Sequence, residues 1–443
     1  MSKTKKLSSQ IIKLLTIYIG VVTAILLLVF MLSGCTDSCT TTTSYTYYEP
    51  VYKTTQEIRA AVKMEEPREL VNPGKIYIYD KYLFINQPNE GIHIIDNTNK
   101  KDPTAISFIN IPGNFDLAVK DNVLYADSYI DLLAFDIGQP AQVNLVKRVE
   151  NAFPLYNQRF GYSPQEGTVI TEMKQLEQHD VSHDCLGRGP DIMFLEGDMI
   201  AFSGNVSQAM NVAPGPAIGT GGSMARFAIV DNYLYAVDDY DLNVFDLATP
   251  ENPQSSESQN IGWGIETIFP YKGNLFIGSR NGMFIYSLSN PELPQYESAV
   301  SHINTCDPVV VNDDYAFVTL RSENNNSWCG DAFTNQLDVI DIKNITNARL
   351  LTSYSMSNPH GLGLDSNVLF VAEGEFGLKV FDVSDIYDID NQLLSEIKDY
   401  HAFDVIPFNQ VLIMIGEDGL YQFDYADPAN LELLSIIPTY DSL

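Results

Sequence analysis

The stretch Leu378-Lys379-Val380-Phe381-Asp382 is one of seven copies of a short pattern, a mostly apolar run that ends in aspartate. The other six copies end, in order along the chain, at Asp96, Asp136, Asp246, Ser287, Asp341 and Asp424. Subtracting successive end positions gives steps of 40, 110, 41, 54, 41 and 42 residues. A period near 40 that is built from short strands is typical of a β-propeller blade, which takes about 40–45 residues.

Each repeat contains more than the aspartate-terminated run. About ten residues before it lies a second apolar strand, such as Tyr315-Ala316-Phe317-Val318, and before that a turn such as Asp121-Asn122 and a further strand. After the aspartate comes a proline-bearing turn such as Asn252-Pro253, followed by a more polar strand. Turn formers thus separate four runs of strand-forming residues. The sequence predicts an all-β fold, a propeller of seven four-stranded blades over residues 57–443.

Two points of this architecture stay open at the level of sequence. Either residues 57–64 or residues 431–437 could supply the outer strand that completes the last blade. The long step between the second and third copies predicts an insertion at about 150–225, expected to project from one face. Its stretch from Ala213 to Gly222 is rich in Gly and Pro, and we expect it to be irregular. The alternative architectures are an open solenoid or two smaller β domains.

The aspartate-terminated runs resemble the repeat of the LVIVD-repeat family of bacterial proteins. The resemblance covers the chain from about residue 73 to the C-terminus, interrupted by the insertion, and Ser287 breaks the pattern in the fourth copy. The family resembles a set of β-propeller lipoproteins without an established biochemical activity. The resemblance therefore implies a fold and a cellular setting, but no chemistry.

The N-terminus reads as a processing signal. Four lysines precede an apolar segment at residues 14–32, and Leu32-Ser33-Gly34-Cys35 follows, which resembles a bacterial lipobox. This order predicts a lipoprotein signal peptide at 1–34 and lipidation of Cys35; the alternative is an uncleaved membrane helix. Residues 35–56 begin with a run rich in Thr and Tyr and predict a flexible tether. We therefore expect an extracytoplasmic protein of the bacterial cell envelope that a lipid anchors to the membrane.

The composition favours export and argues against nucleic-acid binding. The chain has 26 Lys and Arg against 57 Asp and Glu, for a net charge of −31, and such a surface repels polyanions. Four cysteines follow Cys35, and outside the cytoplasm they can pair. Cys306 and Cys329 fall in two connections on the same face of the predicted fifth blade, which predicts a disulfide between them. The pairing of Cys39 and Cys185 stays open.

The sequence contains none of the standard catalytic or phosphate-binding motifs. His179 and His183 stand four residues apart in the insertion and could share a metal ion if that stretch were helical. The alternative is a polar loop. We predict no cofactor, and nothing in the sequence supports a divalent cation beyond this weak metal-binding pattern.

Aligning the repeats brings out a set of polar residues. One polar or charged residue stands eight or nine positions before the Leu83-type position of every copy, where the innermost strand should start. The set is Lys75, Asp116, Arg226, Glu266, Asp307, His360 and Asp404. We predict that these residues ring one mouth of the central channel and bind a polar ligand. Counting four acids against three basic or titratable members predicts a negative mouth that prefers a cation or a hydroxyl-rich ligand. The alternative is ordinary solvation of strand ends.

Three classes of function are consistent with these features. The leading hypothesis is a membrane-tethered, non-enzymatic scaffold that binds an envelope protein or a glycan. The second is an extracytoplasmic hydrolase or lyase that uses Asp116, His360 and Asp404 as acid–base groups. The third is a purely structural envelope component.

Overall fold

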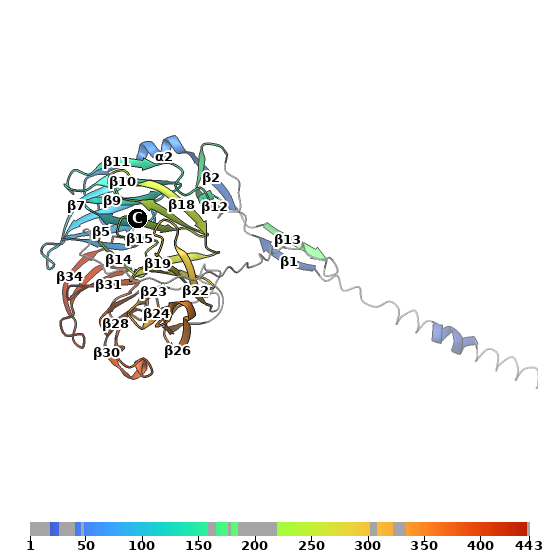
Figure 1. Cartoon of the computed structure of the whole chain (residues 1–443). Coiled ribbons are helices and arrows are strands. Elements are labelled where there is room, and N and C mark those ends of the chain that lie inside the picture. Colours follow the sequence, from blue (N-terminus) through green and yellow to red (C-terminus); the bar gives the residue numbers. More distant parts are fainter. Residues whose placement is uncertain are drawn as a thin grey trace, which may run out of the picture. The chain divides into compact units, whose positions relative to one another are not determined.

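The computed structural model describes residues 18–25, 40–45, 48–157, 165–175, 179–184, 219–301, 308–321 and 334–440, with the backbone alone at 40–45 and 179–184. The chain divides into two compact units. One takes Met1–Pro50 and Met173–Asn205, and the other takes Val51–Glu172 and Val206–Leu443. The second unit holds nearly all the strands (Figure 1).

This larger unit is a seven-bladed β-propeller, as the repeats predict. Each blade is an antiparallel sheet whose four main strands follow one another along the chain. The innermost strands of blades 1 to 7 contact one another in succession. They are β4 (Ile76–Tyr79), β8 (Leu117–Lys120), β15 (Phe227–Val230), β19 (Ile265–Tyr271), β23 (Val309–Val311), β27 (Leu362–Asp365) and β31 (Asp404–Phe408). The second strands are β5 (Tyr82–Gln87), β9 (Val123–Ser128), β16 (Tyr233–Val237), β20 (Asn274–Ser279), β24 (Tyr315–Leu320), β28 (Val368–Ala372) and β32 (Val411–Gly416).

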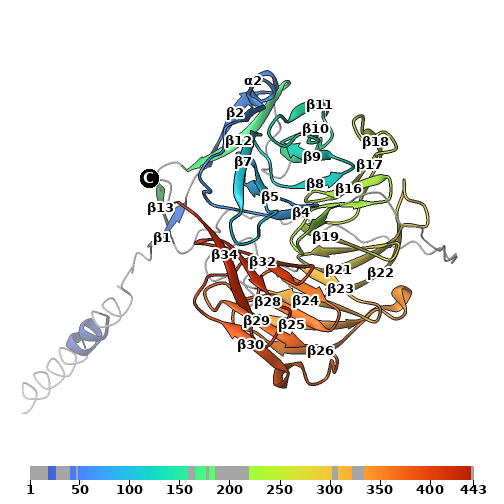
Figure 2. The same cartoon turned by 90° about the vertical axis from the view of Figure 1, so that its left-hand side faces the viewer.

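The third strands are the aspartate-terminated runs, and the fourth strands lie toward the periphery (Figure 2). The third strands are β6 (Gly91–Asp96), β10 (Asp131–Asp136), β17 (Asp241–Asp246), β21 (Gly282–Ser287), β25 (Gln336–Asp341), β29 (Leu378–Asp382) and β33 (Gly419–Asp424). The outer strands are β7 (Thr104–Asn110), β11 (Asn144–Val149), β18 (Gln254–Asn260), β22 (Gln295–Ser301), β26 (Arg349–Ser355), β30 (Leu393–Ile397) and β34 (Glu432–Pro438). Short 3₁₀ turns at Ile345–Asn347 and Ile389–Asn391 precede β26 and β30.

The repeated aspartate has a local structural role. In six blades its Oδ1 accepts a hydrogen bond from the backbone N–H two residues on, at 2.7–3.2 Å, and so begins the turn to the outer strand. Ser287 does the same through its hydroxyl oxygen, which accepts from Ser289 at 3.2 Å. Asp, Asn and Ser favour turns because their side chains can make this bond. The degenerate fourth copy therefore keeps the turn.

The core lies between blades and repeats from one to the next. The third residue of the second strand is a fully buried aromatic in six blades: Phe84, Tyr125, Tyr235, Phe276, Phe317 and Phe370. Every pairing of a third strand with its outer strand also carries a register shift near the same position, as between Ala134 and Phe135. Such bulges increase the local twist, which lets adjacent blades pack face to face.

The ring closes without sharing a blade between the two ends of the chain. Blade 7 takes all four main strands from the C-terminal part, with β34 outermost, which settles the choice that the sequence left open. The N-terminal segment instead adds β3 (Lys63–Glu65) outside β7 as a further strand of blade 1. Leu70 then bridges Thr439 in parallel, and the Tyr440 N–H donates to the Leu70 carbonyl at 2.9 Å.

A short helix precedes β3. In α2 (Thr55–Ala61), Thr54 and Glu57 form a capping box, which satisfies two N–H groups at the start of the helix. Arg59 makes two hydrogen bonds, at 2.8 and 3.0 Å, to the buried carboxylate of Asp131 in blade 2. We call residues 54–70 the N-terminal strap, since they contact blades 2, 1 and 7.

Part of the segment predicted as a flexible tether has regular structure. It contains β1 (Thr40–Tyr45) and β2 (Tyr48–Thr54), and β2 pairs with β12 (Thr168–Gln175) of the insertion. In the smaller unit, β1 pairs antiparallel with β13 (His179–Asp184). Among the described residues, no helix is both long and apolar enough to cross a bilayer.

Candidate binding site at the channel mouth

The structure describes six of the seven residues predicted to ring the channel, and all six stand at the start of an innermost strand. Lys75, Asp116 and Arg226 directly precede β4, β8 and β15, Glu266 is the second residue of β19, His360 comes two residues before β27, and Asp404 opens β31. Asp307 lies outside the described residues. Because the innermost strands all run in the same direction, their starts gather at one end of the channel, which we call the mouth.

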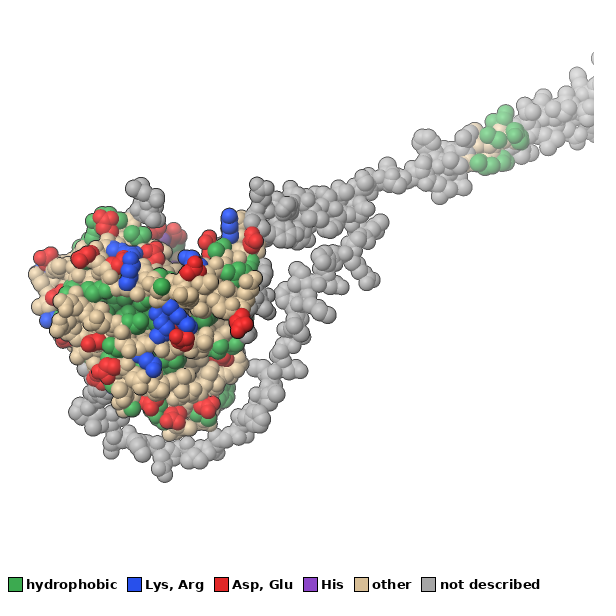
Figure 3. Space-filling view, turned by 90° about the horizontal axis from the view of Figure 1, so that it is seen from above, with side chains coloured by type: hydrophobic (Ala, Val, Ile, Leu, Met, Phe, Trp, Pro, Cys, Tyr) green, Lys and Arg blue, Asp and Glu red, His purple; other side chains and the backbone are tan. Residues whose placement is uncertain are grey.

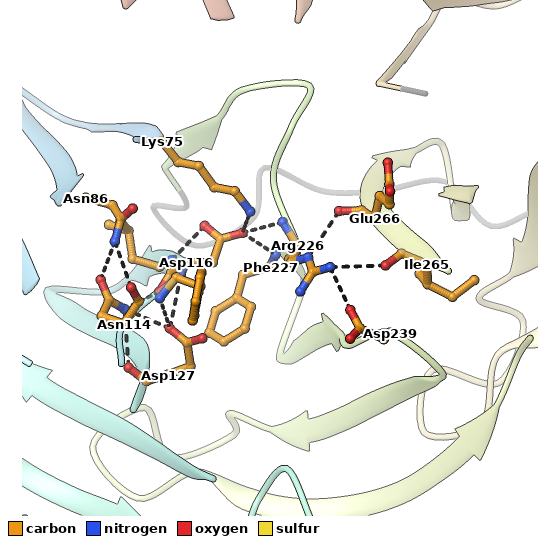
Figure 4. Close-up of polar contacts among 12 residues, drawn as sticks. Lys75, Asn86, Asn114, Asp116, Asp127, Arg226, Phe227, Asp239, Ile265 and Glu266 are labelled. Atoms are coloured by element: carbon orange, nitrogen blue, oxygen red, sulfur yellow. Dashed lines mark hydrogen bonds and ion pairs between the residues drawn. The ribbon is translucent and has the colours of Figure 1, made fainter. Parts of the chain in front are cut away.

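Asp116 joins the first three blades. Its Oδ2 accepts from Lys75 Nζ of blade 1 at 3.0 Å and from two backbone N–H groups of blade 3, those of Arg226 and of Phe227 (3.1 Å). Its Oδ1 accepts from the N–H of Leu117 at 2.7 Å (Figure 4). The residue is 2% exposed. A buried carboxylate with this many donors holds neighbouring blades in register.

A second carboxylate, that of Asp127, fixes the backbone around Asp116. Asp127 Oδ1 accepts from the backbone N–H groups of Phe115 (2.8 Å) and Asp116 (3.0 Å) and from the Asn114 side chain (2.8 Å). The Asn86 amide of blade 1 in turn donates to Asn114 Oδ1 at 2.7 Å. Burial raises the pKa of Asp127 to about 6, although these donors oppose the shift. The alignment of strand starts did not identify this network.

The last part of the insertion crosses the channel. We call residues 219–224 the crossing segment. Its strand β14 (Thr220–Gly221) pairs with β4 of blade 1, and the Gly219 N–H donates to the Val119 carbonyl of blade 2 at 3.1 Å. The segment then reaches blades 6 and 7 through Ser223. The irregular structure predicted for the Gly- and Pro-rich stretch is therefore wrong at its end; its earlier part lies outside the described residues.

Asp404 and Ser223 hold the far end of the crossing segment. Ser223 Oγ donates to Asp404 Oδ1 at 3.1 Å and accepts from the Leu362 N–H at 2.9 Å. The Val405 N–H also donates to Asp404 Oδ1, at 2.9 Å. Both Asp404 and Ser223 are 2% exposed, and burial raises the pKa of Asp404 to about 7. A Cβ atom at Gly222 would come within 2.1 Å of Asp404 Oδ2, so a larger residue here would force the Asp404 side chain to shift.

The other side of the mouth is basic. Arg280 Nε donates to a Glu266 carboxylate oxygen at 3.1 Å. Arg226 donates to the carbonyls of Glu266 (3.3 Å) and Ile265 (3.2 Å) and to Asp239 (3.1 Å). Arg321 lies 2.8 Å from His360 Nδ1; burial, together with this guanidinium, lowers the pKa of His360 to about 3 and keeps it neutral. Neither Arg280 nor Arg321 belongs to the predicted set.

These side chains enclose a cavity of about 550 Å³ at the mouth. Its lining comes from blades 1 to 6 and includes Lys75, Arg226, Arg280 and Arg321 as cations and Asp239 and Glu266 as anions. Aromatic and apolar groups complete it: Phe115, Met224, Tyr240, Trp263, Pro308 and Pro359 are among them. On the face shown in Figure 3, basic side chains gather near the middle, and many acidic ones lie toward the rim.

The described lining does not have the negative charge predicted for the mouth. Four cationic groups stand against two carboxylates. The prediction counted Asp116 and Asp404 as ligand-facing, but both are buried and their oxygens accept from protein donors. It also did not include Arg280 and Arg321, which come from the connections between the second and third strands.

The three residues proposed as acid–base groups do not gather around the cavity. His360 lines it, whereas Asp116 and Asp404 lie outside its lining. Each of the two aspartates is held by hydrogen bonds that join blades. The described geometry therefore does not bring these three groups together as the acid–base hypothesis requires.

The remaining predictions fall wholly or partly outside the described residues. Cys35, Cys306 and Cys329 are not described, so lipidation and the disulfide stay predictions. The helical condition for a metal site at His179 and His183 is not met, because both lie in the strand β13, where residues four apart are about 13 Å apart along the chain. Their side chains are not described, and the described part of the chain contains no metal-like cluster of three His, Cys, Asp or Glu side chains.

Comparisons with known proteins agree with the fold. No protein-family model and no curated protein matches the chain. Among solved structures, a protein from Lactobacillus plantarum is similar, with a TM-score of 0.50 and 14% identity over 83% of this chain and 97% of that one. A functionally unknown protein from Desulfotomaculum acetoxidans gives a TM-score of 0.48 at 11% identity, covering 81% and 95%. BamB from Moraxella catarrhalis gives 0.45 at 8%, covering 77% and 81%. At such identities the likeness is one of fold alone.

Proposed function

We propose that this chain is a binding scaffold of the bacterial cell envelope that takes up its ligand in the cavity at the channel mouth. The observation that carries the proposal is the cavity itself: about 550 Å³, with charged side chains from several blades on an otherwise rigid ring. Pockets of a few hundred Å³ with a small number of placed polar groups are usual ligand sites. The partner is an envelope protein or a glycan that presents a group to this cavity.

The proposed setting comes from the N-terminal sequence. Residues 1–34 act as a signal peptide, Cys35 carries the lipid, and the residues that follow connect it to the propeller at 57–443. The aspartate-terminated repeats support membership of the LVIVD-repeat family. That family resembles a set of β-propeller lipoproteins, which agrees with a lipid anchor at Cys35. A Cys35→Ala variant should then stay full length and take up no palmitate analogue in cells; normal processing and labelling of this variant would contradict the anchor.

Binding at the mouth is testable by site-specific crosslinking. Trp263 lines the cavity and is 48% exposed, while Tyr296 in the outer strand of the same blade is 51% exposed. A photo-crosslinking amino acid at each position therefore samples equally accessible sites that differ in location. We expect discrete adducts in intact cells from position 263 and none from position 296. Equal adduct patterns, or adducts from position 296 alone, would refute the proposed site.

A further inference from the structure

The arrangement of charge in the cavity is unusual for this molecule. The chain has 26 basic residues and a net charge of −31, yet four basic side chains line one cavity. They are not loosely held at the surface: the side chains of Lys75, Arg226 and Arg280 are 22%, 23% and 16% exposed. Gathering like charges in a partly buried place costs free energy unless something opposes their repulsion. The location of these cations therefore calls for a compensating group.

Carboxylates supply such a group for three of the four cations: Lys75 pairs with Asp116 at 3.0 Å, and Arg226 with Asp239 and Arg280 with Glu266 at 3.1 Å each. Arg280, Arg226 and Arg321 all act electrostatically on the one carboxylate of Glu266, whose pKa burial nevertheless raises. On the other side, burial lowers the pKa of Lys75; the charge of Asp116 opposes this shift and Arg226 adds to it. Asp116 already accepts from three backbone N–H groups. Among the described lining groups, positive charge thus exceeds negative charge.

The cavity also has a flat apolar part. Trp263 is nearly half exposed, and the Arg280 guanidinium lies 5.3 Å from its ring centre. Tyr240 lines the same cavity, with Phe115 and Met224. A large exposed indole next to a guanidinium offers one surface for stacking and one for an anion.

We propose that the cavity binds an organic anion built on a planar ring, with its carboxylate or phosphate among Lys75, Arg226, Arg280 and Arg321 and its ring against Trp263. This proposal rests on the proposed function and specifies its ligand. Guanidinium groups bind carboxylate and phosphate through paired, charge-assisted hydrogen bonds. The anion can belong to a small organic acid or to the C-terminal carboxylate of a peptide that ends in an aromatic residue.

Tryptophan fluorescence can test the proposal on the full chain. The chain has two tryptophans, Trp263 in the cavity and Trp328, so a Trp328→Phe variant makes Trp263 the only reporter. The probes are phenyl phosphate and benzene-1,2-dicarboxylate, with inorganic phosphate as the ring-free anion. Benzamide is the neutral match, and benzyltrimethylammonium is the cationic one. We expect the fluorescence of Trp263 to change saturably with each of the two aromatic anions. Benzamide should bind at least about tenfold more weakly, and the cation should not bind.

Two substitutions locate the binding. Arg280→Gln and Lys75→Gln should each weaken binding of phenyl phosphate by about tenfold, because each removes one charged donor. Lys272→Gln is the matched control, since Lys272 lies in the same blade as Arg280 but is 64% exposed and pairs with Asp313 outside the cavity. It should leave the affinity unchanged. An equal loss in all three variants would mean that general charge, and not the cavity, attracts the anion.

The remaining outcomes are decisive. Equal or tighter binding of benzamide or the cation, or no saturable binding of either aromatic anion, overturns the proposal. If the titration fails in this way but crosslinks still form at position 263 and not at position 296, the proposed function stands and only the anionic nature of the ligand is refuted. Peptides that end in phenylalanine, with a free or an amidated C-terminus, show which molecule supplies the anion. Tighter binding of the free terminus assigns the anion to a peptide. Equal, weak binding of both peptides assigns it to a small organic acid.

Discussion

Asp116 and Arg280 both belong to the channel mouth, but they use their charge in different ways. Asp116 is 2% exposed and accepts from Lys75 and from backbone N–H groups of two blades. Arg280 lines the cavity, beside Glu266 and the exposed ring of Trp263. Blades 2 and 7 therefore use buried carboxylates to hold the ring together, whereas blades 1, 3, 4 and 5 place cations in the lining of the cavity. At equivalent strand starts, Asp116 is buried between blades whereas Arg226 lines the cavity, so one repeat position serves different environments.

The largest loss of stability is expected when the buried carboxylate of Asp116 is removed. Asp116→Ala should lower the free energy of unfolding by about 3–5 kcal/mol, because it leaves Lys75 and three backbone N–H groups without their acceptor. Denaturant unfolding followed by far-UV circular dichroism measures the change. Asp239→Ala is the control from the basic side, where the carboxylate is 24% exposed, and its effect should stay under about 1 kcal/mol. Similar losses of unfolding free energy in both variants would show that Asp116 is no more important for stability than the partly exposed Asp239.

A smaller loss is expected in the crossing segment. Gly222→Ala places a Cβ against the buried Asp404 carboxylate and should lower stability by about 1–3 kcal/mol, as overpacking usually does. Gly221→Ala is the neighbouring control, since its Cβ would meet other atoms at 3.3 Å or more. The melting temperatures of the wild type and of Gly221→Ala should both be higher than that of Gly222→Ala. A neutral Gly222→Ala variant would show that the segment does not hold blades 6 and 7.

Asp404 should make stability depend on pH. Its pKa is raised from 3.8 to about 7 in the folded chain, so the folded state binds this proton more tightly than the unfolded state. Its contribution is therefore full below about pH 4 and is lost as pH rises through 7. Asp404→Asn mimics the protonated acid, so its melting temperature relative to wild type should rise between pH 4 and pH 8. Asp313→Asn should show the opposite trend and at lower pH: Lys272 and Tyr271 lower the pKa of Asp313 from 3.8, so the wild-type advantage is full above about pH 5 and is lost as pH falls below about 4.

The smallest effect on stability is expected on the basic side. Arg280→Gln should lower the free energy of unfolding by only about 1 kcal/mol, because glutamine can still donate a hydrogen bond to Glu266 although the pair is 16% and 18% exposed. Chemical denaturation measures this value in the preparation used for the anion titration. A large loss of stability in Arg280→Gln would make Arg280 a structural residue like Asp116.

The sequence predicts the architecture well because the turn chemistry repeats. Each aspartate accepts a local hydrogen bond two residues on, and that bond depends on no other blade. The alignment also finds the positions at the strand starts. It does not tell which of them face the ligand, because burial of Asp116 and Asp404 depends on contacts with residues 110 and 181 positions away.

Two features of the site could be found from the sequence only in part. Counting five residues on from the Leu83-type positions of blades 3, 4, 5 and 7 reaches Asp239, Arg280, Arg321 and Glu417. A second set of charged residues was therefore detectable in the same alignment. The crossing segment was not, because a glycine-rich stretch carries no apolar period and its pairing with β4 bridges more than 140 residues.

The N-terminal strap determines how a pulling force would enter the propeller. A force on the N-terminal side of the chain first loads the pairing of β2 with β12. The Arg59–Asp131 ion pair, β3 on β7 and the bridge between Leu70 and Thr439 follow in that order. None of these contacts pairs two of the four main strands of a blade with each other. Peeling β3 and the bridge therefore dissipates load before any blade loses a strand. We therefore expect the strap to detach at a lower force than the blades, so that the channel mouth stays folded while the strap is pulled away.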